Sequence, residues 1–75
     1  MTLITWSIYV PLLNKGVDAS RPVSAVHMGD GTFRILGSTP AGEQWEFATG
    51  EVVHVKPWIF ADGRKGLLGY EKVAA

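Results

Sequence analysis

The sequence predicts an all-β protein, folded as a small barrel of five or six antiparallel strands. Three observations lead to this prediction. Glycine and proline divide the 75 residues into short segments. Several of these segments alternate apolar and polar residues with the period of two that is typical of strands, and none sustains the period of 3.6 that an amphipathic helix requires. An SH3-like barrel fits this length, an OB-type barrel is the alternative, and we expect a single domain over residues 1–75.

The N-terminal segment predicts the first strand. Its apolar residues recur at every second position, as in a half-buried strand: Ile4, Trp6, Ile8 and Val10. Pro11 ends this strand or places it at a sheet edge, because proline has no N–H for the ladder. Asn14-Lys15-Gly16 then predicts a turn. The uncharged run before Lys15 lacks the basic start of a signal peptide and the roughly 20 apolar residues of a spanning helix, so we expect no membrane partner.

The central hairpin is the strongest local prediction. Asp30-Gly31 lies between two β-prone segments, Arg21–Met28 and Thr32–Leu36. A two-residue hairpin turn of this kind needs positive φ at both central positions, which aspartate tolerates and glycine adopts freely. We expect the turn at Asp30-Gly31, with Gly29 available for a bulge, and the rest of the meander to extend outward from it.

A second hairpin is predicted after the loop at Gly37–Gly42. Trp45 and Phe47 share one face of a strand over residues 43–47, Thr49-Gly50 turns the chain, and Val52–Val55 forms the returning strand. Pro57 is expected to stop that strand. The last strand is predicted over Leu67–Val73, with Gly66 and Gly69 favouring a bend or bulge.

Trp58, Ile59 and Phe60 form an apolar group between a proline and a polar turn. Loops seldom carry this much apolar surface unless it is buried. The group therefore either caps one end of the barrel or contacts a partner, where large side chains commonly act as anchors, and it is the candidate interface. The turn that follows holds the one adjacent pair of basic residues in the sequence, Arg64 and Lys65. These two are the candidate nucleic-acid contact, since small barrels bind single strands by aromatic stacking along a basic groove.

Several short runs resemble a set of short uncharacterised bacterial proteins. The resemblance covers roughly residues 8–56 and is carried by these runs: Val10-Pro11-Leu12-Leu13-Asn14-Lys15-Gly16-Val17-Asp18, Arg21-Pro22-Val23, Gly29-Asp30-Gly31, Arg34-Ile35-Leu36 and Trp45-Glu46-Phe47. Those proteins often have an aromatic residue directly before the Arg-Pro pair, where this chain has Ser20. The resemblance implies a compact β-rich domain of bacterial, environmental or mobile-element origin, and it assigns no catalytic residue.

Composition and charge bear on which classes of function and which partners are expected. Seven basic and seven acidic residues balance, whereas domains that bind nucleic acid through phosphates usually carry a basic excess. The sequence has no cysteine, which excludes disulfides and thiolate metal sites and fits a cytoplasmic protein. Three Trp, three Phe and two Tyr are many rings for so small a core. We expect the surplus at a subunit interface, and hence a homo-oligomer.

Catalytic and metal-binding patterns are weak. His27 and His54 fall on different predicted strands, without the close ligand spacing of the usual metal motifs. No serine stands in a Gly-x-Ser-x-Gly elbow. We therefore expect no metal, no cofactor and no enzymatic activity. The favoured function is a non-catalytic module that binds an unknown protein partner and self-associates. The alternative is a small nucleic-acid-binding regulator.

Overall fold

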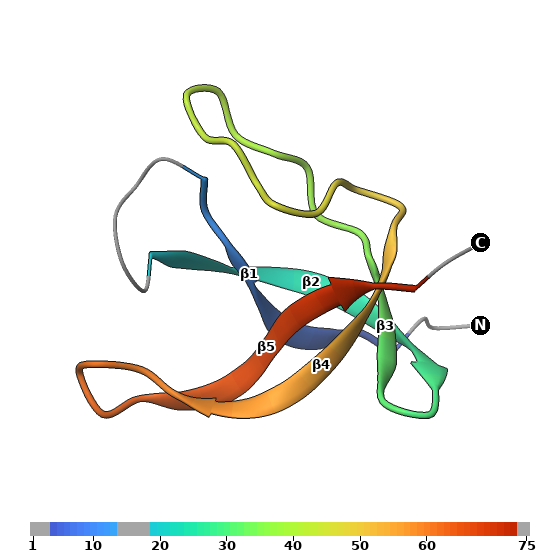
Figure 1. Cartoon of the computed structure of the whole chain (residues 1–75). Helices are drawn as coiled ribbons and strands as arrows, with labels where there is room; N and C mark the ends of the chain where they lie inside the picture. Colours follow the sequence, from blue (N-terminus) through green and yellow to red (C-terminus); the bar gives the residue numbers. More distant parts are fainter. Residues whose placement is uncertain (1–3, 14–18, 74–75) are drawn as a thin grey trace.

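Five strands form one closed barrel in the computed structural model, which describes residues 4–13 and 19–73 (Figure 1). Their bounds are β1 (Trp6–Pro11), β2 (Ser20–Gly29), β3 (Thr32–Ile35), β4 (Val52–Ile59) and β5 (Lys65–Lys72). The predicted all-β barrel of SH3-like size is confirmed, with five strands. The predicted turn at Asn14-Lys15-Gly16 lies outside the described residues. Within those residues there is no helix with the length and hydrophobicity to cross a membrane.

The barrel closes through a parallel pair of strands. Each strand pairs antiparallel with the next along the chain, and β1 pairs with β5 at Tyr9 and Leu68. The expected barrel was antiparallel throughout, and the closing pair differs from that expectation. The reason is the number of strands: in an up-and-down meander of five, the first and the last run in the same direction.

The central hairpin has the predicted geometry. Asp30 and Gly31 have φ of 53° and 74°, so both central residues of the turn are left-handed, as a type I′ turn requires. The register between β2 and β3 shifts between His27 and Gly29, which is the predicted bulge. The Thr32 hydroxyl donates a hydrogen bond to the Gly29 carbonyl at 2.5 Å and ties the two sides of the turn together.

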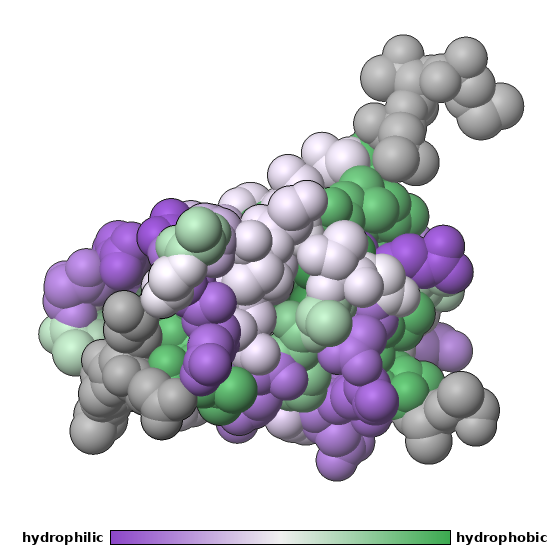
Figure 2. All heavy atoms as spheres, turned by 90° about the horizontal axis from the view of Figure 1, so that it is seen from above, coloured by the Kyte–Doolittle hydropathy of each residue, from purple (hydrophilic) through white to green (hydrophobic). Residues whose placement is uncertain are grey.

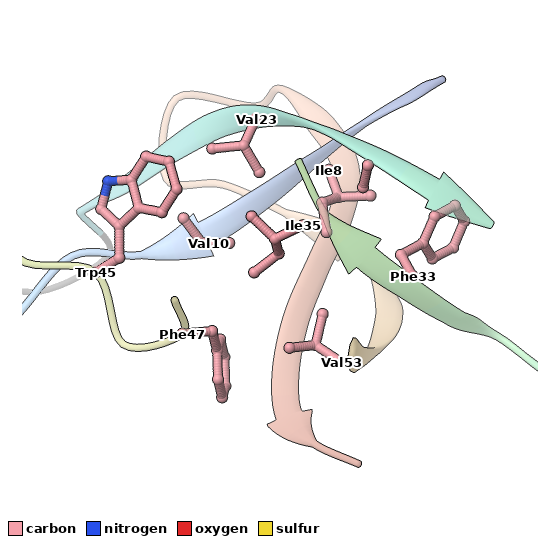
Figure 3. Close-up of a cluster of buried hydrophobic side chains, with 9 residues drawn as sticks. Ile8, Val10, Val23, Phe33, Ile35, Trp45, Phe47 and Val53 are labelled. Atoms are coloured by element: carbon pink, nitrogen blue, oxygen red, sulfur yellow. The ribbon is translucent and has the colours of Figure 1, made fainter. Parts of the chain in front are cut away.

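The core is built mainly by β1, β2 and β3, with Val53 of β4 and two residues of the β3–β4 loop (Figure 3). Alternate residues of the three strands point inward. Trp45 and Phe47 of the loop belong to the same buried cluster. The buried cluster comprises Ile8, Val10, Val23, Ala25, Phe33, Ile35, Trp45, Phe47 and Val53. Each large apolar side chain that is fully buried contributes roughly 1.5–3 kcal/mol.

The predicted second hairpin is wrong in its first strand. Residues 43–47 form a loop segment in which Trp45 makes one isolated bridge to Leu12. The backbone N–H of Leu13 donates to Gln44 at 2.7 Å, and that of Glu46 donates to Pro11 at 3.0 Å. The segment therefore pairs with the end of β1, while the start of β4 is taken by β3. The predicted face is correct, since Trp45 and Phe47 are both buried.

The expectation that Pro57 ends its strand is also wrong. β4 continues through Pro57 to Ile59 and pairs there with β5. On its other side, β4 pairs with β3 only over residues 52–54, and the Val55 N–H donates to Gly31 at 3.1 Å. The nitrogen of Pro57 faces this same side two residues later, where β3 has ended. Proline is tolerated at that position because no ladder hydrogen bond is lost.

Candidate binding surface on the β4–β5 hairpin

The three residues of the candidate interface have different environments. Trp58 and Ile59 are the last two residues of β4, and Phe60 follows them. Ile59 is 65% exposed, Trp58 is half-buried and Phe60 is only 6% exposed. The ring of Phe60 is therefore buried, whereas the aliphatic side chain of Ile59 is exposed.

Phe60 is buried by a small cluster outside the main core. Its ring lies against Tyr9 of β1, with 4.6 Å between ring centroids, and the Arg64 guanidinium lies over both rings at 5.6 and 5.8 Å. Gly66 makes this contact possible, because a Cβ there would lie 2.6 Å from the Tyr9 ring. The cluster attaches the far half of the hairpin to β1.

Arg64 is held at the hairpin tip by Asp62. Its Nε donates to one Asp62 carboxylate oxygen at 2.7 Å and its backbone N–H to the other at 3.0 Å. These contacts, chiefly the backbone hydrogen bond, lower the pKa of Asp62. One of the two candidate nucleic-acid contacts is therefore engaged with a carboxylate and two rings, whereas Lys65 is exposed at the start of β5.

A pocket of about 190 Å³ adjoins Trp58 and Phe60. Three parts of the chain meet there: the end of β1, the start of β2 and the β4–β5 hairpin. Its lining is mainly apolar and consists of Pro11, Leu12, Ala19, Ser20, Trp58, Phe60 and Leu68. Sites for small-molecule ligands usually measure about 300–1,000 Å³, so this pocket suits a single large side chain.

Lys56 and two rings lie beside the pocket. The Lys56 ammonium is 5.0 Å from the Trp58 ring and 5.1 Å from the Tyr70 ring, and the Tyr70 ring is 6.1 Å from His54. Lys56 and Trp58 share a face because they are two residues apart on β4. Tyr70 is the extra residue of β5 at the register shift, where the adjacent His54 and Val55 pair with Glu71 and Gly69.

Part of this surface was predictable from the sequence. Of the predicted apolar group Trp58-Ile59-Phe60, which was expected either to cap the barrel or to contact a partner, Trp58 and Phe60 line the pocket. Leu12 and Leu68 were missed, because strand pairing alone brings them together and no local pattern marks them. The spacing of Lys56 and Trp58 was a usable signal for a shared face. Gly69 indicated a bulge in this part of the last strand, but no local pattern indicated that Tyr70 is its extra residue.

A second group of rings lies at another end of the barrel. Trp6 packs edge-on against Phe33, with centroids 6.0 Å apart, and the His27 ring lies 5.0 Å from Phe33. Trp6 is 50% exposed and Ile4 75% exposed. The two histidines are on different strands, and within residues 4–13 and 19–73 no three His, Cys, Asp or Glu side chains are grouped to hold a metal ion.

Comparison of the chain with protein-family models, curated proteins and solved structures gives no match. The resemblance to short bacterial proteins therefore stays a prediction, and the proposals below depend on the geometry of the hairpin surface.

Proposed function

We propose that this protein is a non-catalytic binding module that holds one large side chain of a protein partner in the pocket beside Trp58. The observation that carries the proposal is the pocket itself, which has mainly apolar walls and the volume of one large side chain. The resemblance to short bacterial proteins supports a bacterial setting, and a cytoplasmic location is part of the same proposal.

The physical basis is the concentration of binding energy in a few anchors. Interfaces obtain most of their affinity from a small number of large side chains seated in desolvated pockets. Burying one leucine-sized or phenylalanine-sized side chain contributes roughly 1.5–3 kcal/mol. This amount gives weak binding alone, so contacts beside the pocket, including Lys56, have to add to it.

Peptide display tests this function. The whole protein is used to select binders from a library of random twelve-residue peptides, and the selected peptides are measured against Ala19→Phe, which fills the pocket from its wall. The matched control is Ala41→Phe, on the exposed β3–β4 loop. We expect binding to fall at least about tenfold in Ala19→Phe, the loss of one anchor, and to persist in Ala41→Phe. Equal binding by both variants would contradict the proposal.

Self-association is the second part of the proposal, and the exposed rings at the other end of the barrel support it. Trp6 and Ile4 present apolar surface that a second copy can cover. Sedimentation at micromolar concentration should show a dimer or larger species, and Trp6→Glu should shift it toward monomer. Leu36→Glu, an exposed change elsewhere, serves as the control. A monomeric wild-type protein would contradict the proposed self-association.

A further inference from the structure

We propose that the partner segment bound at the pocket is acidic, with one large aliphatic or aromatic side chain flanked by aspartate or glutamate. This inference rests on the proposed function and specifies its partner. The evidence for an acidic partner is the set of charged groups near the pocket. An apolar side chain alone would not need these charges for its binding.

Lys56 is a positioned cation at the edge of the pocket. Its ammonium lies between the Trp58 and Tyr70 rings, about 5 Å from each, and it pairs across the ladder with Leu68, which lines the pocket. Cation–π contacts with two rings restrict a long, flexible side chain before any ligand arrives. Less side-chain freedom is then lost when a carboxylate binds.

Two lysines of the hairpin are available to a partner. In the described part of the chain, the ion pairs engage Arg21 with Glu43, Arg64 with Asp62 and Lys72 with Glu51. Lys56 and Lys65 take part in none of these. Lys65 pairs across the hairpin with Ile59, on the face opposite Trp58. Lys56 is therefore the lysine outside these ion pairs that shares a face with Trp58 and Leu68 of the pocket.

The overall neutrality of the chain conceals a separation of charge. The hairpin, residues 52–72, has four basic and two acidic residues, whereas the other described residues have two basic and four acidic ones. The pocket therefore adjoins the positive part of the molecule. Such a field speeds the approach of acidic segments and disfavours basic ones.

The same geometry favours a peptide over a nucleic acid. Base stacking needs free ring faces, but Lys56 lies over Trp58 and Tyr70, and Arg64 lies over Tyr9 and Phe60. A carboxylate can bind Lys56 without displacing it from the rings, whereas a base that stacks on the ring faces occupied by Lys56 has to displace it.

Fluorescence anisotropy with labelled probes tests the inference on the whole protein. The probes are ten-residue peptides with one central leucine flanked by glutamates, glutamines or lysines, a glutamate peptide with central alanine, and a ten-nucleotide oligothymidine. We expect the acidic leucine peptide to bind about tenfold more tightly than the glutamine peptide at about 50 mM salt, and this advantage to shrink at about 500 mM, where charges are screened. Replacing the leucine by alanine should weaken binding at both salt concentrations.

A charge-matched pair of variants locates the effect. Lys56→Glu should lose most of the preference for the acidic peptide, whereas Arg34→Glu, the same change of charge on β3, should retain it. Two results would overturn the inference: equal binding of the glutamine and glutamate peptides, or oligothymidine binding more tightly than every peptide. The first leaves the proposed function intact if Ala19→Phe still abolishes binding. Failure of all the leucine peptides to bind would count against the proposed function itself.

Discussion

The two parts of this barrel use the same alternation of residues for different purposes. In β1, β2 and β3, inward positions such as Ile8, Ala25 and Ile35 are fully buried. In the β4–β5 hairpin, only Val53 is fully buried within the core, and the large rings Trp58 and Tyr70 lie partly or largely exposed. The comparison teaches that the first three strands supply most of the core, while the hairpin is free to carry a binding surface.

The sharpest test of this division compares two isoleucines. Ile35→Ala removes a side chain with no exposed surface from the centre of the core, and we expect a loss of about 2–5 kcal/mol in the free energy of unfolding. Ile59→Ala, at a position 65% exposed, should change stability by less than about 0.5 kcal/mol. Urea denaturation followed by tryptophan fluorescence measures both. Similar losses in the two variants would show that the hairpin contributes as much to stability as the first three strands do.

The next largest effect concerns the attachment of the hairpin to β1. Gly66→Ala places a Cβ 2.6 Å from the Tyr9 ring, and overpacking of this kind costs about 1–3 kcal/mol. Gly37→Ala is the control, since its Cβ would have ordinary contacts at 3.5 Å or more. We expect hydrogen exchange to increase selectively in residues 59–67 of Gly66→Ala. Uniform exchange throughout the barrel would show that the hairpin is no separate unit.

A smaller effect is expected for the cation between the rings. Lys56→Ala should cost about 0.5–1 kcal/mol, the usual contribution of an exposed cation–π contact, and should alter the emission of Trp58. Lys65→Ala, an exposed lysine with no such ring contact among the described residues, should change neither quantity. Chemical denaturation and fluorescence spectra of the two variants provide the measurement. An unchanged Lys56→Ala would contradict the positioning of this side chain.

The smallest effect is a response to acid at two exposed carboxylates. The Ala48 N–H, together with Lys72, lowers the pKa of Glu51, and the Arg64 N–H lowers the pKa of Asp62. Since the folded-state pKa lies below the ordinary value, each stabilisation is complete above that value and is lost as the pH falls through the lowered pKa. The amide chemical shifts of Ala48 and Arg64 should therefore change as the pH falls through these lowered pKa values. The amide of Ile35 should not change over the same pH range. Glu51→Gln should abolish the change at Ala48 alone.

Local chemistry explains why part of the fold was predictable. Asp30-Gly31 determines its own turn, because the required φ values are properties of those two residues. The faces of Trp45 and Phe47 were likewise predictable from a period of two. Their pairing partner was not, because the choice between β4 and the end of β1 depends on which edge is already occupied.

The candidate site was harder to predict for the same reason. Pro57 suggests a strand end, but its effect depends on whether β3 extends far enough to need the missing N–H. The pocket joins Leu12 with Leu68, which are far apart in the sequence. Only the closed barrel makes them neighbours, so no local pattern indicated the cavity between them.

The parallel pair that closes the barrel also has a consequence for synthesis in the cell. Because Tyr9 of β1 pairs with Leu68 of β5, the barrel cannot close until β5 has been synthesised. The ribosome must therefore release all five strands before the closed barrel can form. Contacts so distant in sequence slow folding. Until then the β1 edge intended for β5 stays unpaired in the nascent chain, which makes this interval the period of greatest exposure to misassociation.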